Sequence, residues 1–288
     1  MDAQDFLEGL NNAFATRQPD KVEAYLRTSL IDAERENKKS TVITILNEMI
    51  GFFRNTSNYK EALWASEQAI ATMRTLGQEH SAAFGTTLLN AATAYRAAGQ
   101  TQRALELYHK TEEIYAEHLS ENDARLAGLY NNISSLHETL GNHEKAYNFL
   151  KKALNVLLQL EGTRTASATV YTNLATVLFA LKREEEAKEA LHSAMELFEK
   201  ENDEGKRAPH YAAALANLAA THYRTKQYVM AAKVYEKTLT HLKNCYGENK
   251  DYAVTQKNCA IVLDALGEHG KAENYRKNAD RILQQINS

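Results

Sequence analysis

A regularly spaced row of asparagines is the part of this sequence best suited to recognition chemistry. A primary amide donates two hydrogen bonds and accepts at its oxygen, so a row of amides can bind an extended peptide backbone irrespective of its sequence. The same amides can instead bridge neighbouring helices and satisfy their hydrogen-bonding groups internally. Both interpretations stay open, because one row can serve both. The row, with intervals of 41 to 44 residues, consists of Asn90, Asn132, Asn173, Asn217 and Asn258.

Other polar and charged residues accompany this row at nearby positions. The arginines Arg54, Arg96 and Arg224 are offset by Glu138 and Asp264, so the mixture favours no single sign of ligand charge. Asn131 differs from its neighbour Asn132, because only Asn47 matches it in another repeat. The candidate peptide- or protein-binding residues are Asn47, Arg54, Asn90, Thr93, Arg96, Asn131, Asn132, Ser135, Asn173, Thr176, Asn217, Tyr223, Arg224 and Asn258.

Residues typical of catalysis carry no recognisable signature here. The stretch GEHGK at 267–271 lacks the spacing of a phosphate-binding loop and follows a helical segment, so we interpret it as a turn. No Ser/His/Asp or Cys/His set is recognisable. The run Glu184-Glu185-Glu186 is typical of a solvated helix start, where the helix dipole favours acidic residues. We therefore predict that the chain is not an enzyme and has no catalytic residues.

Residues typical of metal or redox sites are equally sparse. His137 and His222 occupy the same position in repeats two units apart, roughly 20 Å by the usual helix spacing, so we expect packed core histidines. Cys245 and Cys259 are the only cysteines, too few for a zinc site or a disulfide framework, and we expect buried free thiols. The sequence predicts no metal site and no cofactor.

Composition and charge limit the class of partner. The 288 residues are 44% hydrophobic and 25% charged, enough to build a substantial core. A net charge of −3, with Lys and Arg scattered along the chain, argues against nucleic acid. No run of 18 apolar residues and no apolar N-terminal segment occur, which argues against a membrane and favours a cytoplasmic protein.

The elements that position the candidate residues are predicted to be helices. Only two prolines occur, and apolar residues never alternate for long with polar ones as they would in strands. Six segments align on one alanine, at intervals of 41 to 44 residues. Small residues recur twelve before and seven after it, with mostly large residues nine before and four after. The aligned alanines are Ala62, Ala104, Ala146, Ala187, Ala231 and Ala272.

This alternation of small and large residues predicts two antiparallel helices in each repeat, joined by a short turn. Small residues let helices approach closely, and a bulky residue one turn away fills the space beside the crossing. One helix pair cannot bury both faces of its helices, so stability must come from stacking neighbouring pairs. We therefore predict an all-α fold: an α-solenoid, a right-handed superhelix whose first helices line the concave face.

The pattern resembles the tetratricopeptide repeat, specifically its kinesin-light-chain type. The stretches that carry the resemblance are LLNAATAYRAAGQTQRALELYHKTEEIY, YNNISSLHETLGNHEKAYNFLKKAL and CYGENKDYAVTQKNCAIVLDALGEHGKAENY. The first unit departs from it with Ile50 at a small-residue position, and Ser57, Lys182 and Lys226 replace the turn glycine, which we expect to loosen those pairs. The resemblance implies that asparagines at the equivalent place contact bound peptide.

The predicted domain organisation is a cap followed by six repeats. Residues 1–38 are interpreted as a degenerate capping helix pair, with Asp20 as N-cap of its second helix. Residues 39–288 hold the repeats, and the longest connection, 199–209, accounts for the 44-residue interval. The repeats span about 39–78, 79–120, 121–162, 163–205, 206–247 and 248–288.

Two functional hypotheses follow. The first is a non-catalytic scaffold or adaptor that binds a protein or peptide segment in the concave groove. The second is a ligand-responsive sensor that controls an effector through a change of superhelical pitch, because repeat proteins have only nearest-neighbour contacts. A chaperone-type carboxylate clamp is disfavoured, since Gly51, Leu89 and Thr93 occupy positions where it needs lysine or asparagine. Self-association through terminal repeats stays open.

Overall fold

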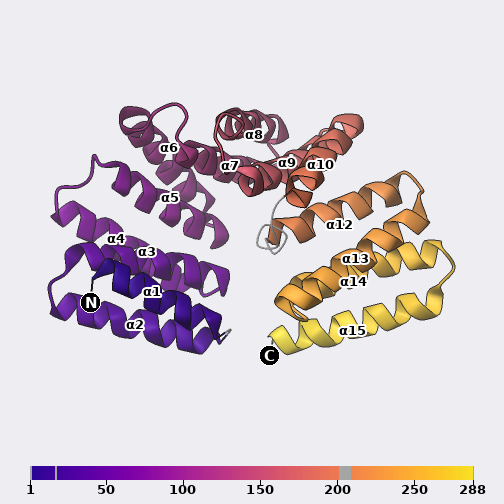
Figure 1. The fold of residues 1–288 in the computed structure, drawn as a ribbon, viewed down its shortest axis with the longest axis horizontal. Helices are drawn as coiled ribbons and strands as arrows, with labels where there is room; N and C mark the ends of the chain where they lie inside the picture. Colours follow the sequence, from indigo (N-terminus) through magenta and orange to yellow (C-terminus); the bar gives the residue numbers. More distant parts are fainter. Residues whose placement is uncertain (1, 17, 201–208, 288) are drawn as a thin grey trace. The chain divides into compact units, whose positions relative to one another are not determined.

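The computed structural model describes residues 2–16, 18–200 and 209–287. The chain divides into two compact units, Met1–Leu136 and His137–Ser288. Fourteen α-helices and no strand occur in the described ranges, so the predicted all-α class is confirmed. Within each unit the helices follow each other as antiparallel pairs (Figure 1).

The helices of the first unit are α1 Ala3–Ala15, α2 Pro19–Arg35, α3 Lys39–Asn55, α4 Tyr59–Thr75, α5 Ala82–Ala97 and α6 Thr101–His118. Helix α7, Ala124–Thr139, contains the boundary between the units. Those of the second unit are α8 His143–Leu157, α9 Arg164–Ala180, α10 Glu184–Glu199, α12 Pro209–Arg224, α13 Tyr228–Tyr246, α14 Lys250–Ala265 and α15 His269–Asn287. The proposed division into a capping pair and six repeats stays a prediction.

The aligned alanines lie where the helices pack most closely. All six have 0% exposed surface, as do the six residues seven positions further along, among them Thr111 and Thr238. Both threonines donate their hydroxyl to a backbone carbonyl one turn earlier, which satisfies the buried oxygen. The residues twelve before the alanines, Ile50 included, are at most 2% exposed. The predicted close packing of these helices is therefore confirmed.

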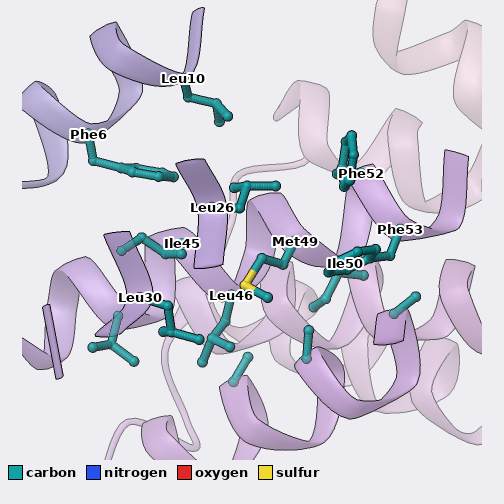
Figure 2. Packing of buried hydrophobic residues seen from close by; sticks show 14 of the residues in the cluster. Phe6, Leu10, Leu26, Leu30, Ile45, Leu46, Met49, Ile50, Phe52 and Phe53 are labelled. Atoms are coloured by element: carbon teal, nitrogen blue, oxygen red, sulfur yellow. The ribbon is translucent and has the colours of Figure 1, made fainter. Parts of the chain in front are cut away.

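The core of the first unit joins α1 and α2 to α3 (Figure 2). Phe6 and Leu26 are fully buried against Ile45, Met49 and Phe53 of α3, each at 0% exposure. Burying one such side chain contributes about 1.5–3 kcal/mol relative to leaving it exposed. The N-terminal helix pair is thus part of the hydrophobic core of the first unit.

The turns inside the helix pairs share one backbone conformation, whether or not glycine is present. Gly99 has φ 76°, and Ser57, Lys182 and Lys226 have φ 61°, 62° and 61°. Each turn also closes with the same hydrogen bond, such as Gln227 N–H to the His222 carbonyl at 2.8 Å. The replacements therefore keep the turn intact, against our expectation of looser pairs. Ser57, Lys182 and Lys226 lower the stability of these turns, because a residue with a side chain disfavours the left-handed conformation.

This conformation predicts that Lys226→Gly stabilises the protein, by about 0.5–1 kcal/mol in the free energy of unfolding, because glycine reaches positive φ without steric cost. The matched control is Lys233→Gly in the exposed interior of α13. That change is expected to cost about 1 kcal/mol, since glycine is a poor helix former. Urea unfolding of both variants measures the difference. Destabilisation by Lys226→Gly would contradict this account of the turn.

The start of α2 corrects one expectation. Asp20 is not the N-cap: the helix begins at Pro19, and Gln18 occupies the cap position without a side-chain hydrogen bond. Proline is favoured at the first helical position, where its fixed φ suits the helix and no N–H is needed. Asp20 instead lies in the first turn, where the helix dipole favours a negative charge. Most of the charged stretch 199–209 lies outside the described residues.

Candidate protein-binding site

Asn47 and Asn90 form a bridge between the first helices α3 and α5. Asn90 Nδ2 donates to Asn47 Oδ1 at 2.8 Å, and Asn47 Nδ2 donates to Thr87 Oγ1 at 3.1 Å. Both side chains are half-buried. The Asn90 amide oxygen accepts no hydrogen bond from the described part of the chain, which leaves it for a ligand N–H. This member of the row thus bridges helices and keeps one acceptor.

Two arginines one repeat apart lie near each other without a neutralising carboxylate. Arg54 on α3 is half-buried and donates from Nη1 to Thr93 Oγ1 at 2.9 Å and from Nη2 to Asn55 Oδ1 at 3.2 Å. Burial and the positive charge of Arg96 lower the pKa of Arg54. The Arg96 Nε atom is buried and has no hydrogen-bond partner. Among the described residues, no carboxylate forms an ion pair with either arginine.

Tyr108 on α6 adds a third polar group to this cluster. Its side chain is 0% exposed, and its buried hydroxyl has no hydrogen-bond partner. Burial raises the pKa of Tyr108, and the nearby Arg96 guanidinium partly offsets that rise. An unsatisfied buried polar group costs about 1–3 kcal/mol, so a ligand that satisfied it would recover part of this energy. We call Arg54, Arg96 and Tyr108 the arginine cluster.

Sequence reasoning found the two arginines of this cluster and missed Tyr108. That tyrosine occupies the large-residue position four after an aligned alanine, where Leu150 and Leu191 stand in other repeats. The position therefore indicated core packing alone. The available signal was the hydroxyl itself, which needs a partner when it is buried.

The remaining candidates of the first unit lie on α7 and make local hydrogen bonds. Asn132 Nδ2 donates to the Gly128 carbonyl at 3.0 Å, and Ser135 Oγ donates to the Asn131 carbonyl at 3.2 Å. Asn131, Asn132 and Ser135 are each half-buried. Asn132 therefore satisfies one amide donor within its own helix, unlike Asn90.

The second unit repeats the bridge seen at Asn90. Asn217 Nδ2 on α12 donates to Thr176 Oγ1 on α9 at 3.0 Å. The Arg224 guanidinium lies over the Phe179 ring, 4.5 Å from its centroid, and so also joins α12 to α9. Tyr223 is exposed, with its ring centroid 5.6 Å from that of Tyr228. Asn173 is half-buried on α9.

Asn258 lies in a different environment from the other members of the row. It is exposed on α14 and lines a hollow of about 350 Å³. Ala213, Ala216 and Val254 line the same hollow, and Val254 is 43% exposed. The row thus combines bridging amides at Asn90 and Asn217 with an accessible amide at Asn258.

The alternative sites considered from sequence have mixed outcomes. His137 is buried and stacks on Phe149 at 5.6 Å, as expected. His222 is only half-buried, with Nδ1 2.6 Å from Gln227 Oε1, so it is not a core residue. Cys259 is buried, but Cys245 is half-buried, because it lies near the end of α13.

The acidic run at residues 184–186 is exposed at the start of α10, as predicted. Over the described ranges, the structure groups no three or more metal-ligating side chains. None of the helices described is long and apolar enough to span a bilayer.

Cys259 gives a prediction for alkaline pH. Burial raises the pKa of its thiol to about 12, whereas an unfolded cysteine ionises near 8.5. The native state therefore retains a proton that the unfolded state has lost, and stability must fall as pH rises from about 9 towards 12. Urea unfolding at pH 8 and pH 10.5 is expected to show a smaller fall for Cys259→Val than for the unchanged chain. An equal fall would contradict burial of the thiol, and Cys245→Ser is the control.

By its fold, the protein is an α-solenoid built from antiparallel helix pairs. The tetratricopeptide repeat model matches residues 125–200 and 210–279, and a second tetratricopeptide repeat model matches residues 85–124. The chain belongs to the tetratricopeptide repeat family. Such repeats typically form non-catalytic protein-interaction scaffolds.

Solved structures of the same fold are distant in sequence. BtubC (BKLC) from P. vanneervenii is 23% identical, with 80% of this chain and 92% of that chain covered and a TM-score of 0.64. The Podosopora anserina putative kinesin light chain repeats are 18% identical over 70% of this chain and 95% of that one, with a TM-score of 0.55. NprR in complex with its cognate peptide NprX is 12% identical over 99% and 79%, with a TM-score of 0.67. No curated protein matches.

Proposed function

We propose that this protein is a non-catalytic scaffold or adaptor that binds a protein or peptide segment on its first helices. The arginine cluster holds an acidic group of that segment. The observation that carries the proposal is the pair Arg54 and Arg96, two half-buried like charges without an ion-paired carboxylate among the described residues. Like charges held together in a partly buried place favour an anion between or beside them.

Three properties of the cluster support a carboxylate as the ligand group. Arginine presents donors in a planar fork that matches a carboxylate in two parallel hydrogen bonds. The Arg96 Nε atom and the Tyr108 hydroxyl are buried donors without partners. Thr93 fixes Arg54 through the 2.9 Å hydrogen bond, so less side-chain entropy is lost on binding.

Within the first unit, Asn90 of the amide row supplies a contact to the backbone of the segment. The free oxygen of Asn90 lies on the same helix as Arg96, so one extended segment can reach both. In the second unit, the accessible Asn258 and the apolar hollow beside it offer an amide together with an apolar surface. The proposed partner is a protein or peptide, not nucleic acid or a membrane. Cytoplasmic location and self-association stay predictions.

Selection from a random peptide library tests the proposal. The expected result is enrichment of peptides that carry aspartate, glutamate or a free terminal carboxylate, because these groups fit the arginine cluster. Their binding is expected to weaken as salt increases, since the contact is charged. Enrichment of peptides without acidic groups, or no enrichment, would contradict the proposal.

A peptide-responsive sensor is the second candidate. The observation that favours it is the repulsion between Arg54 on α3 and Arg96 on α5, which a bound anion would relieve and so change the spacing of these helices. NprR, which shares the fold, is solved in complex with a peptide. X-ray scattering with and without a selected peptide should show changed dimensions if this candidate is correct. Unchanged dimensions at saturation would count against it.

A further inference from the structure

A separate pocket of about 370 Å³ lies between the end of α1, the start of α2 and the second half of α3. Its walls are mainly apolar and include Phe14, Pro19, Val22 and Phe52. One carboxylate, Glu48 on α3, also lines it. Pockets of this size hold small ligands or a single side chain, and a few polar groups in an apolar lining set the specificity.

Glu48 occupies the position in the first repeat that asparagine holds in the other five. Asn90 and Asn217 use this position to reach the first helix before their own. Glu48 forms no hydrogen bond or ion pair with any described residue, and it is half-buried. Burial raises the pKa of its carboxyl group. Among the described residues, no cation therefore compensates this partly desolvated carboxylate.

Part of the apolar wall of the same pocket is open to solvent. Phe14 is 46% exposed, although its ring centroid lies 6.4 Å from that of Phe52. A large exposed aromatic side chain beside a pocket loses water when a ligand covers it, which favours an apolar body. A carboxylate that is only partly hydrated favours a positively charged group beside that body.

We propose that this pocket binds an ammonium group carried on an apolar body, as a lysine side chain or a free peptide amino terminus next to an apolar residue presents. Glu48 pairs with the ammonium group, and Phe14 and Phe52 cover the apolar part. The inference does not depend on the proposed function, because the arginine cluster shares none of these residues.

The test uses the full chain and three probes of similar shape: 2-phenylethylammonium, the neutral 2-phenylethanol and the anionic 3-phenylpropanoate. Amide NMR spectra are expected to shift around Gly51 and Asn55 with the ammonium probe, at millimolar concentration. Glu48→Gln should weaken this probe about two- to fivefold, as expected for loss of a partly exposed ion pair, and leave the alcohol unchanged. Phe14→Ala should weaken both probes. Glu34→Gln, an exposed carboxylate on α2, is the matched control.

Equal affinity for the ammonium and alcohol probes, or unchanged affinity in Glu48→Gln, would overturn the inference. Two short peptides then separate the possible sources, one with a lysine amine and a blocked terminus, the other with a free amino terminus and no lysine. A third peptide, with both amines blocked, is the reference. If either of the first two peptides binds more tightly than this reference, the pocket is supported and the source of the ammonium group is identified. If neither binds more tightly, the inference is overturned. Arg54→Gln and Arg96→Gln should leave these probe affinities unchanged, so failure here is distinct from failure of the scaffold proposal.

Discussion

Replacing Arg54 and Arg96 together by glutamine is expected to weaken a selected acidic peptide by about a hundredfold. Each charged hydrogen-bonding group contributes about 1.5–3 kcal/mol, and about 1.4 kcal/mol corresponds to tenfold in the dissociation constant. The single variant Arg96→Gln should weaken peptide binding more than Tyr108→Phe does, because the latter removes only the hydroxyl from the cluster. Fluorescence polarisation with a labelled selected peptide measures all three variants at one salt concentration.

The control for this loss is a variant with the same change of net charge. Arg74 and Arg103 pair with Glu79 and Glu106 on the surface of the first unit, so Arg74→Gln with Arg103→Gln should bind the peptide nearly as the unchanged chain does. The free energy of unfolding of Arg54→Gln with Arg96→Gln should fall little, because these changes also remove the repulsion between Arg54 and Arg96 in the native state. Equal losses in both double variants would show that net charge, not the arginine cluster, determines binding.

Phe53→Ala is expected to cost about 3–5 kcal/mol of unfolding free energy, which is the range for emptying a buried aromatic site. Phe53 is 0% exposed on α3, and its ring centroid lies 5.3 Å from that of Phe52 in an edge-to-face arrangement. The Arg27 guanidinium carbon lies over the Phe53 ring, 5.2 Å from its centroid. The loss should reach the N-terminal helix pair, because that pair packs on the same core (Figure 2). Urea unfolding measures the change in free energy.

The matched control for Phe53 is Phe14→Ala, in which the same side chain is removed from a half-exposed position. That variant should lose only about 1 kcal/mol, since nearly half of the Phe14 side chain is already exposed. A cost for Phe53→Ala as small as the control would mean that the N-terminal helix pair does not depend on this core.

The fold was predictable because the packing rule repeats. Ala62 and Ala104 occupy equivalent positions one repeat apart and are both fully buried, so a single spacing predicts both helices of each pair. The turn geometry was not predictable from residue type alone. Lys182 and Lys226 adopt the left-handed conformation of glycine because the closing hydrogen bonds of the turn compensate for it.

The candidate site was predictable in part. Recurrence identified Asn90 and Asn217 but could not tell bridging amides from an accessible one such as Asn258, since all three occupy the same place in the repeat. The arginine cluster also depends on a residue from a third helix, Tyr108 on α6, which lies near Arg54 of α3 and Arg96 of α5. Glu48 was visible as an exception to the row, but its apolar surroundings come from α1 and α2.

A charge exchange tests the central claim most directly. The acidic residues of a selected peptide are replaced by lysine, and Arg54 and Arg96 are replaced by glutamate in the protein. We expect each single exchange to abolish measurable binding in fluorescence polarisation, because like charges then face each other, and the double exchange to restore at least part of the affinity. Binding of the original acidic peptide that persists in Arg54→Glu with Arg96→Glu would contradict the account.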